Sequence, residues 1–178
     1  MSKKAITLVI AAAWLVIALT IIISKERILS TGNMIMLETE PVDPRDLLRG
    51  DYVILNYKIS NIDIARLARE PGNYSRGQQI NINLEPIGKF WQPKAVWLRT
   101  KPSGGVNIKG VVRNSQGPAL SIEYGIESYF VPEGKGANIE AAIRRTAQGK
   151  VAVEVAVDNS GRAMINRVLI DDLPVKFD

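Results

Sequence analysis

Histidine and cysteine are both absent from this chain of 178 residues, and aromatic residues make up only 6% of it. Their absence excludes a histidine-based catalytic triad, a thiol nucleophile and a disulfide framework, and it removes the usual ligands of zinc, haem and iron–sulfur sites. Any catalysis would therefore depend on hydroxyl, lysine or carboxylate groups, and we expect no metal and no cofactor. The remaining composition, 46% hydrophobic and 23% charged, excludes a disordered acidic chain and a collagen-like one.

Residues 5–24 contain no charged side chain (AITLVIAAAWLVIALTIIIS). A helix of this length is about 30 Å long, which matches the hydrocarbon core of a bilayer. A cleavable signal peptide is the main alternative, but its apolar region is usually shorter, and the small-residue motif at 11–13 comes too early for cleavage. A buried core helix is the other alternative. We therefore predict an uncleaved signal anchor over residues 1–24, a juxtamembrane linker over 25–32 and one domain over 33–178.

Positive charges lie on both sides of the predicted span, with Lys3 and Lys4 before it and Lys25 and Arg27 after it. The positive charges on the two sides of the span are nearly equal, so the positive-inside rule hardly favours either orientation. A short basic tail is, however, easily retained in the cytoplasm, and long downstream domains translocate largely regardless of charge. We expect the N-terminus in the cytoplasm and the domain outside it. Lys3 and Lys4 are two of 23 basic residues; without them, 21 basic and 18 acidic residues leave a net charge of +3. This charge is too small for nucleic-acid binding but suits an anionic lipid bilayer, which we expect as a partner.

From residue 33 onward, apolar residues recur mainly at every second position, which is typical of half-buried strands. In the segment 52–59, Val53, Leu55, Tyr57 and Ile59 share one face. The other predicted strands are 33–39, 79–84, 94–100, 106–113, 119–124, 128–131, 151–157 and 163–170. Glycine, proline and asparagine clusters separate them, and the cluster at 158–161 predicts a hairpin between the last two strands.

Helical patterns in the domain are short and occur at 61–69 and 138–146. We therefore predict a mainly β fold, in which a single N-terminal transmembrane helix is followed by a β-rich domain with one or two short helices. The pattern fits a barrel-like domain or a sandwich.

The segment 41–52 (PVDPRDLLRGDY) combines charged residues, proline and glycine most densely. In a purely local interpretation, Asp43 caps one helical turn, Gly50 ends it, and Asp51 accepts backbone N–H groups where the next strand begins. A functional interpretation starts from Arg45 and Arg49, which are four residues apart and would share a helix face. Two guanidinium groups in this arrangement suit a carboxylate or a phosphate, so both are candidate binding residues.

The stretch GDYVILNY (50–57) resembles the signature of the GDYXXLXY family, with every fixed position filled: Gly50, Asp51, Tyr52, Leu55 and Tyr57. The preceding PVDPRD (41–46), the KGVV strand (109–112) and YFVPEG (129–134), which contains Glu133, also look like that family. The resemblance implies a membrane-anchored bacterial envelope protein of the inner (cell) membrane, often encoded beside polytopic membrane proteins. It implies no established activity.

A single helix, then a β-rich domain, then a strand entered through LLRGDYV (47–53) is also the layout of signal peptidase I. In that family, a serine soon after the anchor is activated by a lysine, without histidine. Here TGNM (31–34) stands where that pattern has Ser-Gly-Ser-Met, so Asn33 occupies the nucleophile position, and the distance to the GD motif is longer. Ser30 or Thr31 would be the alternative nucleophile, with Lys58 or Lys109 as base.

Three hypotheses of function follow. The leading one is a non-enzymatic, single-pass envelope protein whose domain binds a partner, expected to be a polytopic membrane protein. Alanines at positions 11–13 and 18 of the predicted helix allow close packing against other helices. The second is a membrane-tethered Ser–Lys hydrolase. The third is a module outside the cytoplasm that binds an anionic lipid or cell-wall ligand through Arg45 and Arg49.

Overall fold

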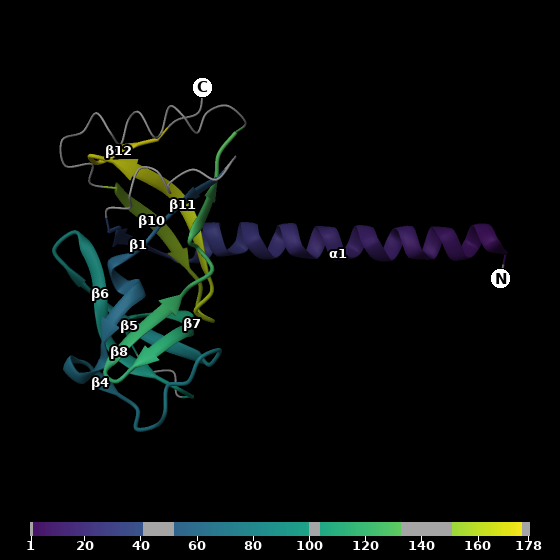
Figure 1. Ribbon diagram of the computed structural model, residues 1–178. Coiled ribbons are helices and arrows are strands. Elements are labelled where there is room, and N and C mark those ends of the chain that lie inside the picture. Colours follow the sequence, from purple (N-terminus) through teal and green to yellow (C-terminus); the bar gives the residue numbers. More distant parts are fainter. Residues whose placement is uncertain (1, 41–51, 100–103, 133–150, 176–178) are drawn as a thin grey trace.

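The computed structural model describes residues 2–40, 52–99, 104–132 and 151–175. The chain is mainly β, with one long N-terminal helix and a β-rich domain, as the sequence predicts (Figure 1). The helix is α1 (Lys3–Thr31), and two short 3-10 helices are η1 (Lys58–Ser60) and η2 (Ile64–Arg66). The described strands are β1 (Asn33–Glu38), β2 (Tyr52–Ile54), β3 (Asn61–Asp63), β4 (Ala68–Arg69), β5 (Gln79–Ile87), β6 (Phe90–Trp97), β7 (Val106–Gln116), β8 (Ala119–Glu123), β9 (Ser128–Phe130), β10 (Val151–Val157), β11 (Ala163–Ile170) and β12 (Leu173–Pro174).

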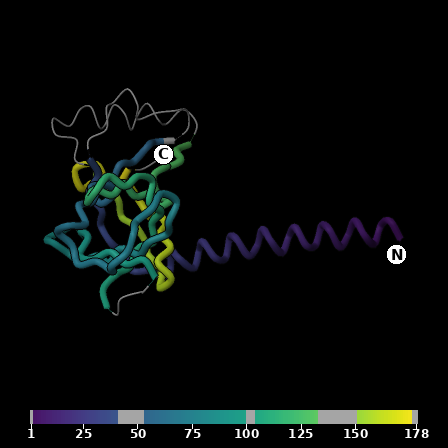
Figure 2. The backbone as a smooth tube through the Cα atoms, turned by 60° about the horizontal axis from the view of Figure 1, so that its bottom comes forward, coloured from purple at the N-terminus to yellow at the C-terminus, as the bar shows by residue number. Residues whose placement is uncertain are grey.

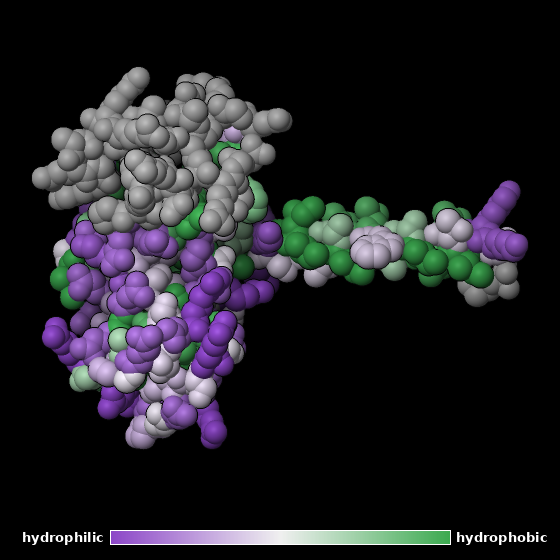
Figure 3. Space-filling view, in the orientation of Figure 1, coloured by the Kyte–Doolittle hydropathy of each residue, from purple (hydrophilic) through white to green (hydrophobic). Residues whose placement is uncertain are grey.

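α1 is a continuous helix of 29 residues, about 43 Å long. It is long and apolar enough to cross a membrane, and none of its most apolar stretch is buried inside the protein. The helix projects alone from the domain (Figure 2), and its surface is largely hydrophobic (Figure 3). The segment 25–31, predicted to belong to a linker, is instead the end of this helix, because its residues are ordinary helix formers and the first break comes at Gly32.

The chain turns directly from α1 into a four-stranded antiparallel sheet of order β1-β10-β11-β12. β10 and β11 form the predicted hairpin, in which Gly161 has a φ of +87° that favours glycine. β12 was not predicted. It follows a two-residue turn, Asp171 and Asp172, and both residues adopt positive φ. In the two views, β11 lies on the side of the domain from which α1 leaves (Figures 1 and 2).

The second sheet has six strands in the order β3-β8-β7-β5-β6-β4. Its two edge strands, β3 and β4, are almost consecutive in the chain, because only 64–67 lie between them. Five extended residues span at most about 17 Å, whereas the edges of a flat six-stranded sheet are about 24 Å apart. The sheet must therefore curl until its edges approach each other. Of the two predicted architectures, this part of the domain is the barrel-like one.

The third sheet is the antiparallel pair β2-β9, which joins the start of the stretch 52–57 to the segment 128–130. All three sheets contribute to one hydrophobic core. The largest side chains that are completely enclosed in it are Tyr57, Ile35, Leu37, Ile80, Ile82, Leu84, Ile108 and Leu120. The core thus fixes the β domain as one packed unit beneath the end of α1.

The helix predicted at 61–69 is wrong. Asn61–Asp63 is strand β3, paired with β8, and Ala68–Arg69 is strand β4, paired in parallel with β6. Between them, the Asp63 carboxylate accepts the N–H of Ala65 at 3.0 Å and starts the short helix η2. The conformation of the segment is therefore decided by the strands that pair with its two ends. The mixed apolar pattern of its own sequence does not indicate these partners. The helix predicted at 138–146 lies outside the described residues.

Candidate functional site

The described part of the signature stretch, residues 52–57, contributes to the hydrophobic core. β2 begins at Tyr52 and pairs with β9, so that Val53 lies opposite Tyr129. Val53, Leu55 and Tyr57 are buried and Asn56 between them is exposed, as the period-two pattern predicts. After β2, the chain stays attached to its neighbours through the Leu55 N–H, which donates to the carbonyl of Glu127 at 2.8 Å. Leu55 and Tyr57 are therefore packing residues.

Two tyrosine hydroxyls lock this region to the loop between β8 and β9. The Tyr57 hydroxyl donates to the carbonyl of Ile126 at 2.6 Å, and the Tyr124 hydroxyl donates to the carbonyl of Ile59 at 2.6 Å. Burial, and then the nearby charge of Glu127, raise the pKa of both phenols far above the usual range. Both tyrosines therefore stay protonated and act as hydrogen-bond donors, not as proton acceptors.

The other predicted site residues lie outside the described residues. These are the candidate binding residues Arg45 and Arg49, and the motif residues Gly50, Asp51 and Glu133. Only the backbone of Tyr52 is described.

The junction between α1 and the domain is a second candidate region, and its importance is not evident from the sequence. Ile28 is buried, and α1 packs against β10 and β11. At the end of the helix, the Gly32 N–H donates to the carbonyl of Ile28 at 2.9 Å. A Cβ on Gly32 would lie 2.5 Å from that carbonyl oxygen and 3.1 Å from the Val157 nitrogen. A side chain at position 32 would therefore clash with the last turn of α1 and would also crowd the backbone of β10, which favours glycine between the two elements.

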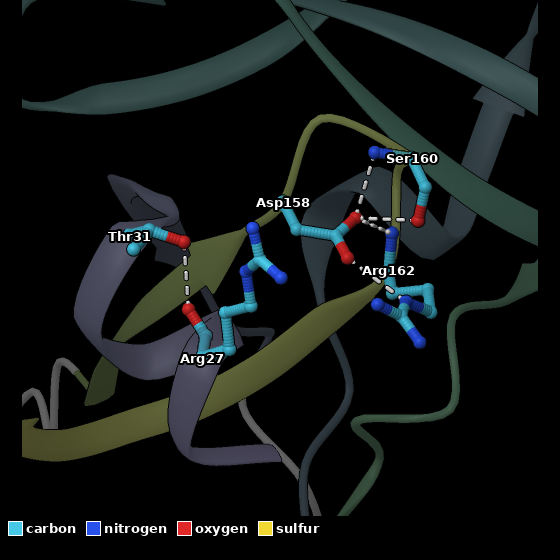
Figure 4. Close-up of polar contacts among 5 residues, drawn as sticks. All are labelled: Arg27, Thr31, Asp158, Ser160 and Arg162. Carbon is cyan, nitrogen blue, oxygen red and sulfur yellow. Dashed lines mark hydrogen bonds and ion pairs between the residues drawn. The ribbon is translucent and has the colours of Figure 1, made fainter. Parts of the chain in front are cut away.

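Asp158 organises the β10–β11 turn beside the junction (Figure 4). One of its carboxylate oxygens accepts the N–H groups of Ser160 and Arg162 at 2.8 and 2.9 Å, and the other accepts Nε of Arg162 at 2.8 Å. Partial burial opposes ionisation of Asp158, but hydrogen bonds from Ser160 and Arg162 outweigh it and lower the pKa to about 2. The side chain of Arg27 extends from α1 towards this turn (Figure 4).

The hydroxyls proposed for a Ser–Lys hydrolase are engaged within α1. Thr31 Oγ1 donates to the carbonyl of Arg27 at 2.8 Å, and Ser30 Oγ donates to the same carbonyl at 3.3 Å. Lys58 Nζ forms an ion pair with Glu38 at 2.7 Å. Within the described residues, neither hydroxyl is hydrogen-bonded to Lys58 or Lys109. The arrangement that would activate one of them is therefore not assembled in this conformation.

Open grooves lie on the surface of the six-stranded sheet. One of about 370 Å³ is formed between β7, β8 and the β10–β11 turn, and Lys109, Glu123, Tyr124 and Arg162 contribute to its walls. Another of about 510 Å³ lies beside η2 and includes Arg69 and the buried Tyr74. Among the described residues, histidine, cysteine and carboxylate side chains form no group of three or more that could hold a metal ion.

The chain matches the family model described as GDYXXLXY protein over residues 14–168, which is most of its length. The match begins inside α1 and ends in β11, so it includes the junction, the barrel-like sheet and the signature stretch. No curated protein and no solved structure matches the chain. The chain therefore belongs to the GDYXXLXY family.

Proposed function

We propose that this protein is a non-enzymatic, single-pass protein of the bacterial inner membrane whose domain lies outside the cytoplasm and binds a polytopic membrane protein. The observation that carries the proposal is the exposure of large apolar side chains on the surface of α1. Large apolar residues along the helix are exposed, among them Leu8 and Trp14 at 71% and 68%. A helix that is hydrophobic all round needs lipid or another helix around it.

The junction supports a partner that is itself in the membrane. α1 passes into β1 with only Gly32 between them, and the end of the helix packs on the domain. A helix in the bilayer would therefore hold the domain against the membrane surface instead of releasing it on a flexible tether. Partners that present both a transmembrane and an extramembrane surface are polytopic proteins, and the alanines at 11, 12, 13 and 18 would allow close helix contact.

The chain contains no cysteine, so single cysteines can be introduced to test this proposal by site-specific cross-linking in intact cells. Ala12→Cys places a thiol on α1, and Met34→Cys places one at the exposed start of β1, near the junction. Arg66→Cys is the matched control, since Arg66 is exposed and η2 lies between the edge strands of the barrel-like sheet. The proposal expects one membrane protein to be cross-linked from both Ala12→Cys and Met34→Cys, and none from Arg66→Cys.

If Ala12→Cys and Met34→Cys yield no common protein, or yield only a soluble one, the partner proposal is wrong. A separate test addresses topology. A reporter that is active only outside the cytoplasm, fused after Asp178, is expected to be active, and the mature protein is expected to keep residues 1–24. An inactive fusion, or a mature N-terminus beyond Ser24, would contradict this orientation or the uncleaved anchor.

A further inference from the structure

The groove between β7 and the β10–β11 turn is built around a close backbone approach. The Lys109 N–H donates to the carbonyl of Gly161 at 2.8 Å, which attaches the turn to β7. A Cβ on Gly161 would lie 3.0 Å from Cγ of Lys109. The missing side chain at Gly161 therefore lets the Lys109 side chain lie along the turn, and Val111, Tyr124 and Ala163 add apolar surface beside it.

The charges around this groove are only partly compensated. Arg113 pairs with Glu123 at 2.6 Å, and Arg162 pairs with Asp158 through Nε. Within the described ranges, the two terminal nitrogens of Arg162 have no acceptor. The carboxylate of Glu127 accepts the N–H groups of Tyr124 and Gly125.

Two further cations remain. Lys109 and Arg27 form no ion pair within the described residues, and Arg27 extends from α1 towards the turn that carries Arg162 (Figure 4). Lys109 and Arg162 line the groove itself, and Arg27 approaches the turn that carries Arg162 from α1.

The position of Arg27 along α1 corresponds to the headgroup layer of a membrane. The uncharged run ends at Ser24. Arg27 lies three residues beyond it, at a rise of about 4.5 Å, and each headgroup layer is about 5–7 Å thick. Lys25 and Glu26 at the same level offset each other in charge. The β10–β11 turn, beside the last turns of α1, would therefore meet lipid phosphates and not bulk solvent.

We propose that the groove between β7 and the β10–β11 turn binds the phosphate of an anionic phospholipid, with Arg27, Lys109 and Arg162 as its ligands. The groove fixes the rotation of the domain on the membrane, since it lies to one side of α1. This inference rests on the part of the proposed function that places α1 in a bilayer, and it does not depend on the protein partner.

The test measures lipid binding to the purified full-length protein in mild detergent by native mass spectrometry, with phosphatidylglycerol and phosphatidylcholine titrated separately at constant ionic strength. Arg27→Gln with Lys109→Gln removes the two cations without breaking an ion pair of the described residues. Arg66→Gln with Lys94→Gln is the control for net charge, because it removes the same two residue types from η2 and from β6, which lies away from α1 (Figure 1). It also removes the exposed ion pairs with Asp63 and Glu85, which contribute little to stability. Arg162 is left intact because it holds the turn.

We expect the wild-type protein to bind phosphatidylglycerol more tightly than phosphatidylcholine. The Arg27→Gln/Lys109→Gln variant should bind phosphatidylglycerol about 30-fold more weakly. This factor is the combined effect on affinity that two cations typically have near an anionic membrane surface. The control variant should bind it as the wild type does. All three proteins should unfold at the same temperature, since no core residue changes.

An equal loss in the two double variants would show a general effect of net charge and overturn the proposed groove. Absence of a preference for phosphatidylglycerol would also overturn it. Displacement of the lipid by excess inorganic phosphate would show that the groove takes a free anion, which contradicts the assignment to a lipid headgroup. Failure of the cross-linking experiment leaves this result unaffected, so the two proposals fail independently.

Discussion

α1 and the β domain contain the same kinds of apolar side chain but place them in opposite surroundings. Leu15 in α1 is 62% exposed, whereas Leu55 in the domain is 3% exposed. In the space-filling view, the helix surface is largely hydrophobic, whereas the coloured part of the domain surface that faces the viewer is largely hydrophilic (Figure 3). The domain is stabilised by its own core, whereas most apolar side chains of the helix have no core to enter among the described residues. Substitutions of one residue type should therefore have different effects in the two regions.

The largest difference is expected between Leu55→Ala and Leu15→Ala. Leu55 is enclosed in the core, so its truncation should lower the free energy of unfolding by about 2–5 kcal/mol through lost burial and the cavity left behind. Leu15 touches no core, and its truncation should change the unfolding of the domain by less than about 0.5 kcal/mol. Chemical denaturation of the full chain in detergent, followed by tryptophan fluorescence, measures both. Similar losses in the two variants would contradict the separation of helix and core.

The reverse difference is expected for insertion into a membrane. Leu15→Arg places a charge near the middle of the uncharged run and should raise the apparent free energy of insertion by about 3 kcal/mol. Leu173→Arg is the matched control, because Leu173 is 72% exposed on β12 and is not part of the helix. In a quantitative insertion assay, Leu15→Arg should insert less efficiently than Leu173→Arg. The β domain should remain folded in both variants. Unchanged insertion of Leu15→Arg would argue against α1 as the membrane-spanning element.

The contact between the two regions is expected to depend on Gly32. Gly32→Ala puts a Cβ 2.5 Å from the Ile28 carbonyl oxygen and 3.1 Å from the Val157 nitrogen, so the backbone that joins the helix end to β1 must shift, at a cost of about 1–3 kcal/mol. Ser30→Ala is the control, since Ser30 is exposed and its hydroxyl only donates within the helix. Thermal unfolding and hydrogen exchange at β1 and β10 measure the effect. Equal behaviour of the two variants would mean that the helix is only loosely attached.

The smallest expected effect is the pH dependence of the β10–β11 turn. The pKa of Asp158 is about 2 in the folded protein, below the value of 3.8 for the free side chain. Ionised Asp158 therefore stabilises the folded state above about pH 4, and this contribution falls as the pH decreases through 3.8 towards 2. Urea unfolding between pH 5 and pH 2 should show a smaller decrease in stability for Asp158→Asn than for the wild type. A parallel decrease would assign the acid sensitivity to other carboxylates.

Much of the strand content could be predicted from the sequence, since burial on one face imposes a period of two that is visible in the chain. The pattern in 52–59 identified Val53, Leu55, Tyr57 and Ile59 as core residues, and all four are buried. It overestimated the strand, which ends at Ile54, because alternating burial continues through a bridge and the 3-10 helix η1 without a regular ladder. Periodicity thus reports which residues are buried and not how the backbone is hydrogen-bonded.

The segment 61–69 shows the opposite failure. Its apolar residues fit a helix as well as they fit a strand, and the short length gives helical propensity little weight. Pairing with β8 at one end and β6 at the other decides the outcome, and both partners are distant in sequence. The same pairing curls the six-stranded sheet. Five predicted site residues lie outside the described residues, so their roles remain predictions: the candidate binding residues Arg45 and Arg49, and the motif residues Gly50, Asp51 and Glu133.

The sequence by itself determined that this protein has one long apolar helix, a β-rich domain, the core face of its signature stretch and its family. Each of these depends on a local pattern or on a motif within a few residues. Only the tertiary structure decided that the helix continues into a packed junction, that the sheet curls, and that Lys109 and Arg162 line one groove. Those features join residues that are far apart in the chain, and their contacts exist only after the strands have paired.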